Sequence, residues 1–154
     1  MPKIDRATAP RGHGTRYPPP HDAPCRAREW LKLGDAAGLT QFGVNLLRLP
    51  PGAWSGQRHW HTHEDEFVYV LAGEVVLVTD AGEELLSRGA AAGFKAGVAD
   101  GHCLQNRSAQ DAEILVVGGR SDADRAHYPD IDLAVDPGRY SGPATFRRKD
   151  GRAY

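Results

Sequence analysis

Residues 59–73, HWHTHEDEFVYVLAG, carry most of what can be inferred about this chain. From Glu66 onward the stretch is a short run of β-branched and aromatic residues that ends at Gly73, which is typical of a strand followed by a turn. Before it, His59, His61 and His63 occupy alternate positions. Alternate side chains of an extended strand share one face, so we expect these three imidazoles to point the same way.

Similar strand-like runs lie on both sides of this stretch. Between residues 38 and 118, short runs of β-branched and aromatic residues are separated by turn signals rich in Gly, Pro and Asp about every 8 to 12 residues. No amphipathic stretch long enough for a helix interrupts them. This pattern predicts an all-β antiparallel sandwich or barrel. The expected strands are residues 40–49, 57–61, 66–71, 74–79, 83–87, 90–94, 101–105 and 113–117.

The two ends of the chain have a different composition. Residues 1–37 and 120–154 are rich in Pro, Gly and charged residues, and we expect them to form extended arms. Residues 28–33 fit either a helical face or a strand and are left unassigned. A chain of 154 residues matches a single domain. We therefore expect an N-terminal arm and lead-in at 1–37, a β-barrel at 38–119 and a C-terminal arm at 120–154.

The charge balance argues against several classes of partner. The 19 Lys and Arg residues against 20 Asp and Glu give a net charge of −1, which does not favour nucleic acid or anionic lipid as a partner. The longest nearly apolar run, residues 67–72, is far shorter than the roughly 20 residues that cross a bilayer. There is no apolar signal-like core at the N-terminus, and two cysteines do not make a disulfide framework. A cytoplasmic location is expected.

One expected strand has apolar residues on both faces. In residues 66–71, Val68 and Val70 alternate with Phe67, Tyr69 and Leu71. One face can look into the barrel, whereas the other needs a partner subunit or one of the arms to cover it. A homodimer with twofold symmetry is the expected assembly.

The histidines and Glu66 suggest a metal site. A turn at residues 62–65 would bring Glu66 onto the neighbouring strand, and His102 stands at the head of a later strand. A His-rich, acidic stretch also suits a solvated hairpin loop. Glu66, however, begins an apolar strand, where an unpaired carboxylate is costly and a metal ion offsets that cost. Three imidazoles and one carboxylate would leave a divalent ion with positions open to water or substrate.

These residues resemble the cupin family. Its first motif is matched by His59, His61, Glu66 and Gly73, with Gly52 one residue away from the place of the opening glycine. Its second motif is matched by Gly89, Gly97, His102 and Asn106. In this chain Lys95 stands where the family has proline, and four residues rather than two separate Gly97 from His102.

The resemblance implies a small jelly-roll β-barrel that binds one divalent transition metal ion inside, with iron, manganese, nickel, cobalt and zinc all suitable. The implied ligands are His59, His61, Glu66 and His102. His63 could replace a ligand, act as a proton shuttle or have no role, and His63 and Glu66 are the candidates for proton transfer. The surroundings also resemble a group of bacterial single-domain cupins without an assigned reaction.

Other residues near the motifs have simpler interpretations. Lys95 is either a solvated turn residue or a cation that holds an anionic substrate. Trp60 and Cys103 alternate out of phase with the histidines and should pack away from the metal. His127 and Tyr128 reach the site only if the C-terminal arm folds over the barrel mouth.

We therefore expect a metalloenzyme that acts on a small, oxygen-rich, anionic metabolite by Lewis-acid chemistry. Dioxygenase, isomerase, decarboxylase and lyase reactions are all compatible with the family. A non-catalytic barrel that binds or senses a small molecule is the alternative. A sugar-phosphate isomerase is a further one, supported in the sequence only by Lys95.

Overall fold

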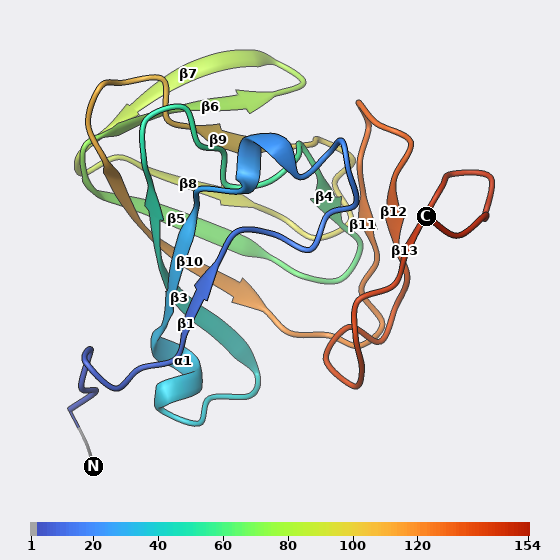
Figure 1. Ribbon diagram of the computed structural model, residues 1–154, viewed down its shortest axis with the longest axis horizontal. Helices are drawn as coiled ribbons and strands as arrows, with labels where there is room; N and C mark the ends of the chain where they lie inside the picture. Colours follow the sequence, from blue (N-terminus) through green and yellow to red (C-terminus); the bar gives the residue numbers. More distant parts are fainter. Residues whose placement is uncertain (1–2) are drawn as a thin grey trace.

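The computed structural model describes residues 3–154, and almost all of its regular structure is β-strand (Figure 1). Helical structure in this part of the chain is limited to a 3-10 turn, η1 (Ala23–Cys25), and a single turn of α-helix, α1 (Leu33–Ala36). The strands are β1 (Arg11–His13), β2 (Glu29–Lys32), β3 (Phe42–Leu49), β4 (Trp60–His61), β5 (Glu66–Ala72), β6 (Glu74–Thr79), β7 (Gly82–Ser87), β8 (Ala91–Phe94), β9 (Cys103–Gln105), β10 (Ala112–Gly119), β11 (Ala126–His127), β12 (Ala134–Val135) and β13 (Phe146–Arg147).

The predicted all-β jelly-roll class is confirmed. The strands form a six-stranded sheet in the order β1-β2-β3-β10-β5-β8, a three-stranded sheet β7-β6-β9 and a four-stranded sheet β13-β12-β11-β4. The strand pairs are antiparallel. The hydrogen-bonded ladders remain three separate sheets and do not close into one continuous barrel.

The main core lies between the six-stranded and the three-stranded sheets. Val68 and Val70 of β5 are buried there because alternate residues of the strand face inward, and Val75 and Leu77 of β6 meet them from the other sheet. Glu66 is on the same side of β5 as Val68 and Val70. The strand alternation that makes the core therefore also places this carboxylate inside the molecule.

The N-terminal segment extends the large sheet. Strand β1 pairs with β2, and β2 pairs with β3, so the unassigned residues 28–33 contain an edge strand. Leu31 packs with Ala9 and Leu46 on one side of this edge. Trp30 and Lys32 project to the other side, toward a cavity.

The C-terminal segment is also ordered into strands. Strand β11 pairs with β4, so that Ala126 lies opposite His61 and His127 lies opposite Trp60. A second apolar cluster, which contains Tyr128 and Leu133, holds this small sheet together. The segment after the last long strand is thereby fixed beside the histidine motif.

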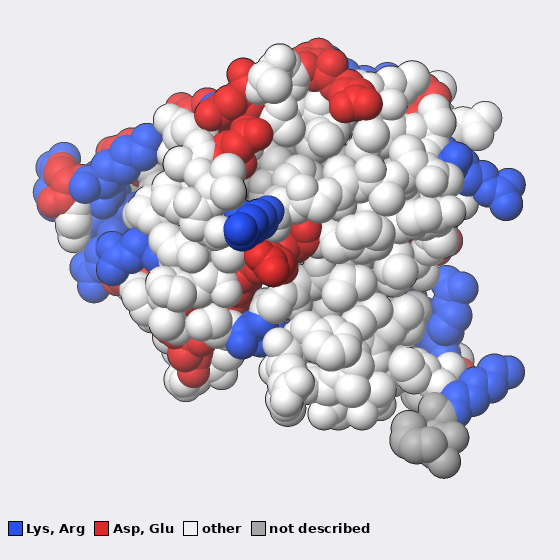
Figure 2. Space-filling model, turned by 180° about the vertical axis from the view of Figure 1, so that it is seen from behind, with Lys and Arg blue, Asp and Glu red and all other residues white. Residues whose placement is uncertain are grey.

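The outer face of β5 is open to solvent in the single chain. Phe67, Tyr69 and Leu71 are 43%, 37% and 38% exposed, and neither terminal segment covers them. Figure 2 shows a broad area with few charged side chains on the side of the molecule opposite to the view of Figure 1. Among residues 3–154 there is no helix with the length and apolar character needed to span a membrane.

Candidate functional site

The backbone brings His59 and His102 together. The two residues form an isolated antiparallel bridge, in which the amide of each donates to the carbonyl of the other at 3.1 Å and 2.9 Å. Their rings consequently lie with centroids 5.0 Å apart. The two extra residues before His102 are accommodated in the loop that follows β8, where the amide of Gly97 donates to the carbonyl of His61 at 2.8 Å.

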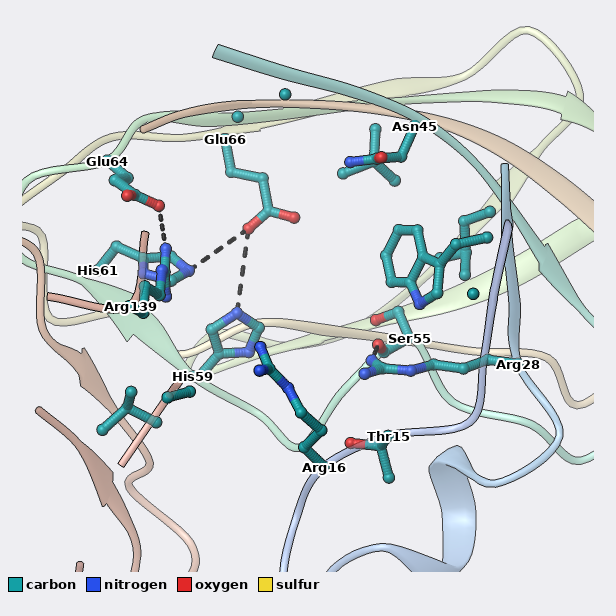
Figure 3. A pocket seen from close by; sticks show the side chains of 18 of the residues that line it. Thr15, Arg16, Arg28, Asn45, Ser55, His59, His61, Glu64, Glu66 and Arg139 are labelled. Atoms are coloured by element: carbon teal, nitrogen blue, oxygen red, sulfur yellow. Dashed lines mark hydrogen bonds and ion pairs between the residues drawn. The ribbon is translucent and has the colours of Figure 1, made fainter. Parts of the chain in front are cut away.

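Hydrogen bonds fix the orientation of His59 and His61. The Nδ1–H of His59 donates to the backbone carbonyl of Gln57 at 2.7 Å. The Nδ1 of His61 lies 2.7 Å from a carboxylate oxygen of Asp124, to which it donates. With a proton on Nδ1, each neutral ring keeps the lone pair of Nε2 free as a metal ligand. The two Nε2 atoms are 4.0 Å and 3.9 Å from the Oε2 atom of Glu66 (Figure 3).

Glu66 and His102 complete the cluster. The Nε2 atom of His102 is 3.0 Å from Oε2 of Glu66, and the ring stacks on Phe94. The Nδ1 atom of His102 is buried and has no hydrogen-bond partner. Three imidazoles thus surround the Glu66 carboxylate, with their Nε2 atoms 3.0 Å to 4.0 Å from its Oε2, although their positions span residues 59–102 of the sequence.

The protonation states suit a cation. Burial, and after it the neighbouring His102 and His61, lower the pKa of His59 to about 3, so this ring is neutral at neutral pH. Burial raises the pKa of Glu66, but the hydrogen bond from His102 and the nearby imidazoles outweigh burial and bring it to about 2. A neutral His59 beside an ionised Glu66 is the state in which these two groups bind a metal.

Asp124 is the orienting group of the site. Its side chain is fully buried, and it accepts from the backbone amide of His63 at 2.9 Å and from the hydroxyl of Thr62 at 3.3 Å, besides its bond to His61. Burial raises its pKa, but these hydrogen bonds lower it to about 2, so the group is an anion. A carboxylate behind a metal-binding histidine fixes its tautomer and strengthens it as a ligand.

His63 does not join the other histidines. Strand β4 ends at His61, and the bonds from residues 62 and 63 to Asp124 turn the chain at this point. The expectation that all three imidazoles share a face is therefore wrong. The ring of His63 is exposed, contacts the hydroxyl of Thr62 at 2.8 Å and is absent from the cavity lining.

The cluster opens into a large cavity. Its volume is about 710 Å³, and it lies between the two main sheets and both terminal segments. Arg16, Arg28 and Arg139 line this space (Figure 3). Tyr17 and Tyr128 line it as well. Burial raises the pKa of Tyr128 well above its usual range, so its hydroxyl stays protonated.

The remaining sequence candidates lie around this site. Trp60 stacks on His127 with ring centroids 4.3 Å apart, outside the large cavity, and Cys103 is buried. Tyr128 does reach the site, because its ring centroid is 5.7 Å from that of His59. Lys95 is exposed and lines only a smaller hollow of about 220 Å³.

Sequence reasoning missed several groups of the cavity. Asp124, Arg16, Arg28 and Tyr17 come from the terminal segments, where no periodicity or motif marks them. The one local pattern that could have indicated Arg28 is strand alternation, because residues 28, 30 and 32 share a face and all line the cavity.

The chain is similar in sequence and structure to known cupin proteins. A family model described as "Cupin domain" matches residues 45–118. A sugar phosphate isomerase from a cupin superfamily, from Silicibacter pomeroyi, is 46% identical with a TM-score of 0.91, and the match covers 99% of this chain and 96% of that chain. A proposed sugar phosphate isomerase from Acidithiobacillus ferrooxidans is 28% identical with a TM-score of 0.74, over 83% of this chain and 80% of that chain.

More distant structures share the fold alone. A polyketide cyclase from Streptomyces resistomycificus is 23% identical with a TM-score of 0.61, over 77% of this chain and 79% of that chain. No match to this chain was found among curated protein sequences.

Proposed function

This chain belongs to the cupin superfamily, and on that basis we propose that it is a metal-dependent enzyme that acts on a small, oxygen-rich, anionic metabolite. One observation carries the proposal. Three imidazoles and the Glu66 carboxylate converge at the wall of a cavity large enough for a small metabolite, about 710 Å³.

The residues fit a divalent transition metal ion. The hydrogen bonds of their Nδ1 atoms hold His59 and His61 with Nε2 toward Glu66, and the donor atoms of His59, His61 and Glu66 lie within 4.8 Å of one another. His102 presents its Nε2 atom to the same carboxylate, 3.0 Å from Oε2 of Glu66, so a fourth donor lies beside these three. Mixed nitrogen and oxygen donors suit iron, manganese, nickel, cobalt or zinc.

Residues of the chain would bind the substrate and move protons around the metal ion. When bound, the ion supplies Lewis-acid polarisation of substrate oxygens. The Oε1 atom of Glu66 accepts no hydrogen bond from the described residues, so it is available for a proton. Tyr128 donates to the hydroxyl of Tyr17 at 3.4 Å, which leaves the Tyr17 hydroxyl free to donate to a substrate oxygen. Residues of the six-stranded sheet and of both terminal segments line the cavity around these groups.

Metal content tests this proposal. Full-length protein purified under metal-replete conditions should hold close to one ion per chain by elemental analysis. His59→Ala and Glu66→Gln should each lose most of it, because each change removes a ligand or its charge. His63→Ala is the matched control, since it lies in the same stretch and outside the cavity, and its metal content should be unchanged. Wild-type protein that stays largely metal-free would refute the proposal.

Sugar phosphate isomerisation is the more specific candidate. It is supported by the 46% identical structure, which is that of a sugar phosphate isomerase and aligns over nearly the whole chain. NMR of metal-loaded protein with a panel of aldose and ketose phosphates should show interconversion of one pair, and the Glu66→Gln variant should not. Absence of turnover together with a ligand-dependent rise in melting temperature would support a binding or sensing protein instead.

A further inference from the structure

The N-terminal segment brings positive charge to the cavity. Arg16, Arg28 and Lys32 all line it, and no carboxylate of the described residues lies within 4.0 Å of their charged groups. Figure 3 shows the Arg16 side chain extending from this segment toward His59. This wall of the cavity therefore carries cations that the protein itself does not neutralise.

The other cations of the cavity are already paired. Arg139 forms an ion pair with Glu64 and lies 3.3 Å from Asp124, and Arg120 forms an ion pair with Asp35. These three pairings belong to the C-terminal and α1 sides of the cavity. The unpaired charge is thus concentrated on the N-terminal side.

Arg28 is held in place by groups that leave its charge available. It is half-buried, its Nε–H donates to the carbonyl of Gly14 at 2.9 Å, and a second N–H donates to the carbonyl of Ser55. A guanidinium has five N–H donors, so three remain. The Cζ atom of Arg28 lies 5.3 Å from the ring centroid of Trp30. A cation that is partly desolvated and has no counter-charge is costly unless a ligand supplies one.

Arg28 lies close to the histidine cluster. Its partner Ser55 precedes Gly56, where an added Cβ would sit 3.2 Å from the hydroxyl of Tyr17 and 3.5 Å from Cε1 of His59. The Arg28 guanidinium carbon is also 5.8 Å from the ring centroid of Tyr17, so Arg28 and His59 lie on the same wall of one cavity. A small metabolite can span the separation between them within this cavity.

We propose that Arg28 and Arg16 form an anion subsite that binds the phosphate group of a phosphomonoester substrate. This proposal rests on the proposed function in one respect: with its phosphate group at Arg28 and Arg16, the substrate would turn its reacting oxygens toward the Glu66 cluster. Two cations without acidic partners match the charge of about −2 that a phosphomonoester carries at neutral pH. Arginine also binds phosphate through two parallel N–H groups.

Titration calorimetry with inorganic phosphate tests this subsite. The full-length protein is titrated as purified and again after dialysis against a chelator, and sodium acetate is titrated in parallel. Wild-type protein should bind phosphate saturably in both states and acetate far more weakly. Arg16→Gln and Arg28→Gln should each weaken phosphate binding by about 10-fold or more, which is the effect of losing a charge-assisted hydrogen bond.

Arg11→Gln is the matched control. Arg11 lies in β1 on the same segment, carries the same charge, is exposed and does not line the cavity. Phosphate affinity should be unchanged in this variant. Arg16 makes no hydrogen bond within the described chain, so its variant keeps the test decisive if Arg28→Gln fails to fold.

Several outcomes would overturn the subsite. The first is wild-type protein that does not bind phosphate saturably, or that binds acetate as strongly as phosphate. The second is an equal loss of phosphate affinity in Arg11→Gln and Arg16→Gln. The third is phosphate binding that disappears when the metal is removed. Metal content is measured separately on the same samples. A protein that binds phosphate and no metal would therefore contradict the proposed function and leave the subsite intact. A protein that binds metal and no phosphate would contradict the subsite and leave the proposed function intact.

Discussion

Replacing Asp124 by Asn should weaken metal binding without removing any ligand. Asp124 accepts the Nδ1–H of His61 at 2.7 Å and is fully buried. The Asn side chain can face His61 in two orientations, and neither replaces the carboxylate. If its oxygen faces His61, it accepts a neutral hydrogen bond of roughly half the strength. If its NH2 group faces His61, Nδ1 must accept, and the proton moves to Nε2, where it blocks the lone pair that binds the ion.

Loss of such a partner usually costs 10- to 100-fold in metal affinity. This corresponds to about 1.4–2.8 kcal/mol of binding free energy. The carboxylate also accepts from the amide of His63 at 2.9 Å, and the side chain of Arg139 lies 3.3 Å away. The Asn variant should therefore lose about 1–3 kcal/mol of folding stability as well, because a partly satisfied polar group remains buried.

Competition with a chromophoric chelator measures this affinity, with Co2+ or Zn2+ as the probe and circular dichroism to confirm that the protein is folded. Asp122→Asn is the matched control, because Asp122 is two residues away and bonds to Tyr140 and Ser141, not to a histidine. Its metal affinity should equal that of the wild type. An Asp124→Asn variant with wild-type affinity, or an equal loss in Asp122→Asn, would show that Asp124 does not orient the ligand.

Two further predictions concern assembly and stability. The exposed apolar face of β5 should pair two chains, so light scattering at micromolar concentration should give a dimer that Tyr69→Lys dissociates; a monomeric wild type would contradict this. Gly73→Ala should destabilise the fold by more than the roughly 1–3 kcal/mol of a positive-φ penalty, because its Cβ would lie 2.5 Å from the carbonyl of Asp111 at a φ of 69°. Gly82→Ala, with a φ of 124° and nothing within 4 Å, should show the conformational penalty alone in urea denaturation, and equal losses in the two variants would rule out the clash.

The strands could be predicted because their signal is local. Alternation of side chains between two faces set the expected bounds of the strand at 66–71, which the structure gives as Glu66–Ala72, and of 74–79, which it gives as Glu74–Thr79. The same alternation placed Glu66 on the buried side with Val68. The position of His102 beside His59 needed the family resemblance, since a pairing across 43 residues leaves no local trace.

The face of His63 was mispredicted for a related reason. Alternation holds only while the strand continues, and β4 ends at His61. The group that ends it is Asp124, which binds residues 62 and 63 from about 60 positions further along the chain. No property of the histidine stretch itself indicates this interruption. The C-terminal segment, described from sequence only as an arm, thus determines which histidines face the cavity.

The origin of each group suggests how chemistry and selectivity are divided along the chain. The candidate ligands His59, His61, Glu66 and His102 all lie within residues 45–118, the part that matches the cupin family model. Arg28 and Asp124 lie outside it, on either side. The central sheets can therefore assemble the cluster, while the N-terminal segment supplies charge for a substrate and the C-terminal segment orients a ligand. Since the terminal segments close two walls of the cavity, they, and not the shared core, should determine which anion this protein accepts.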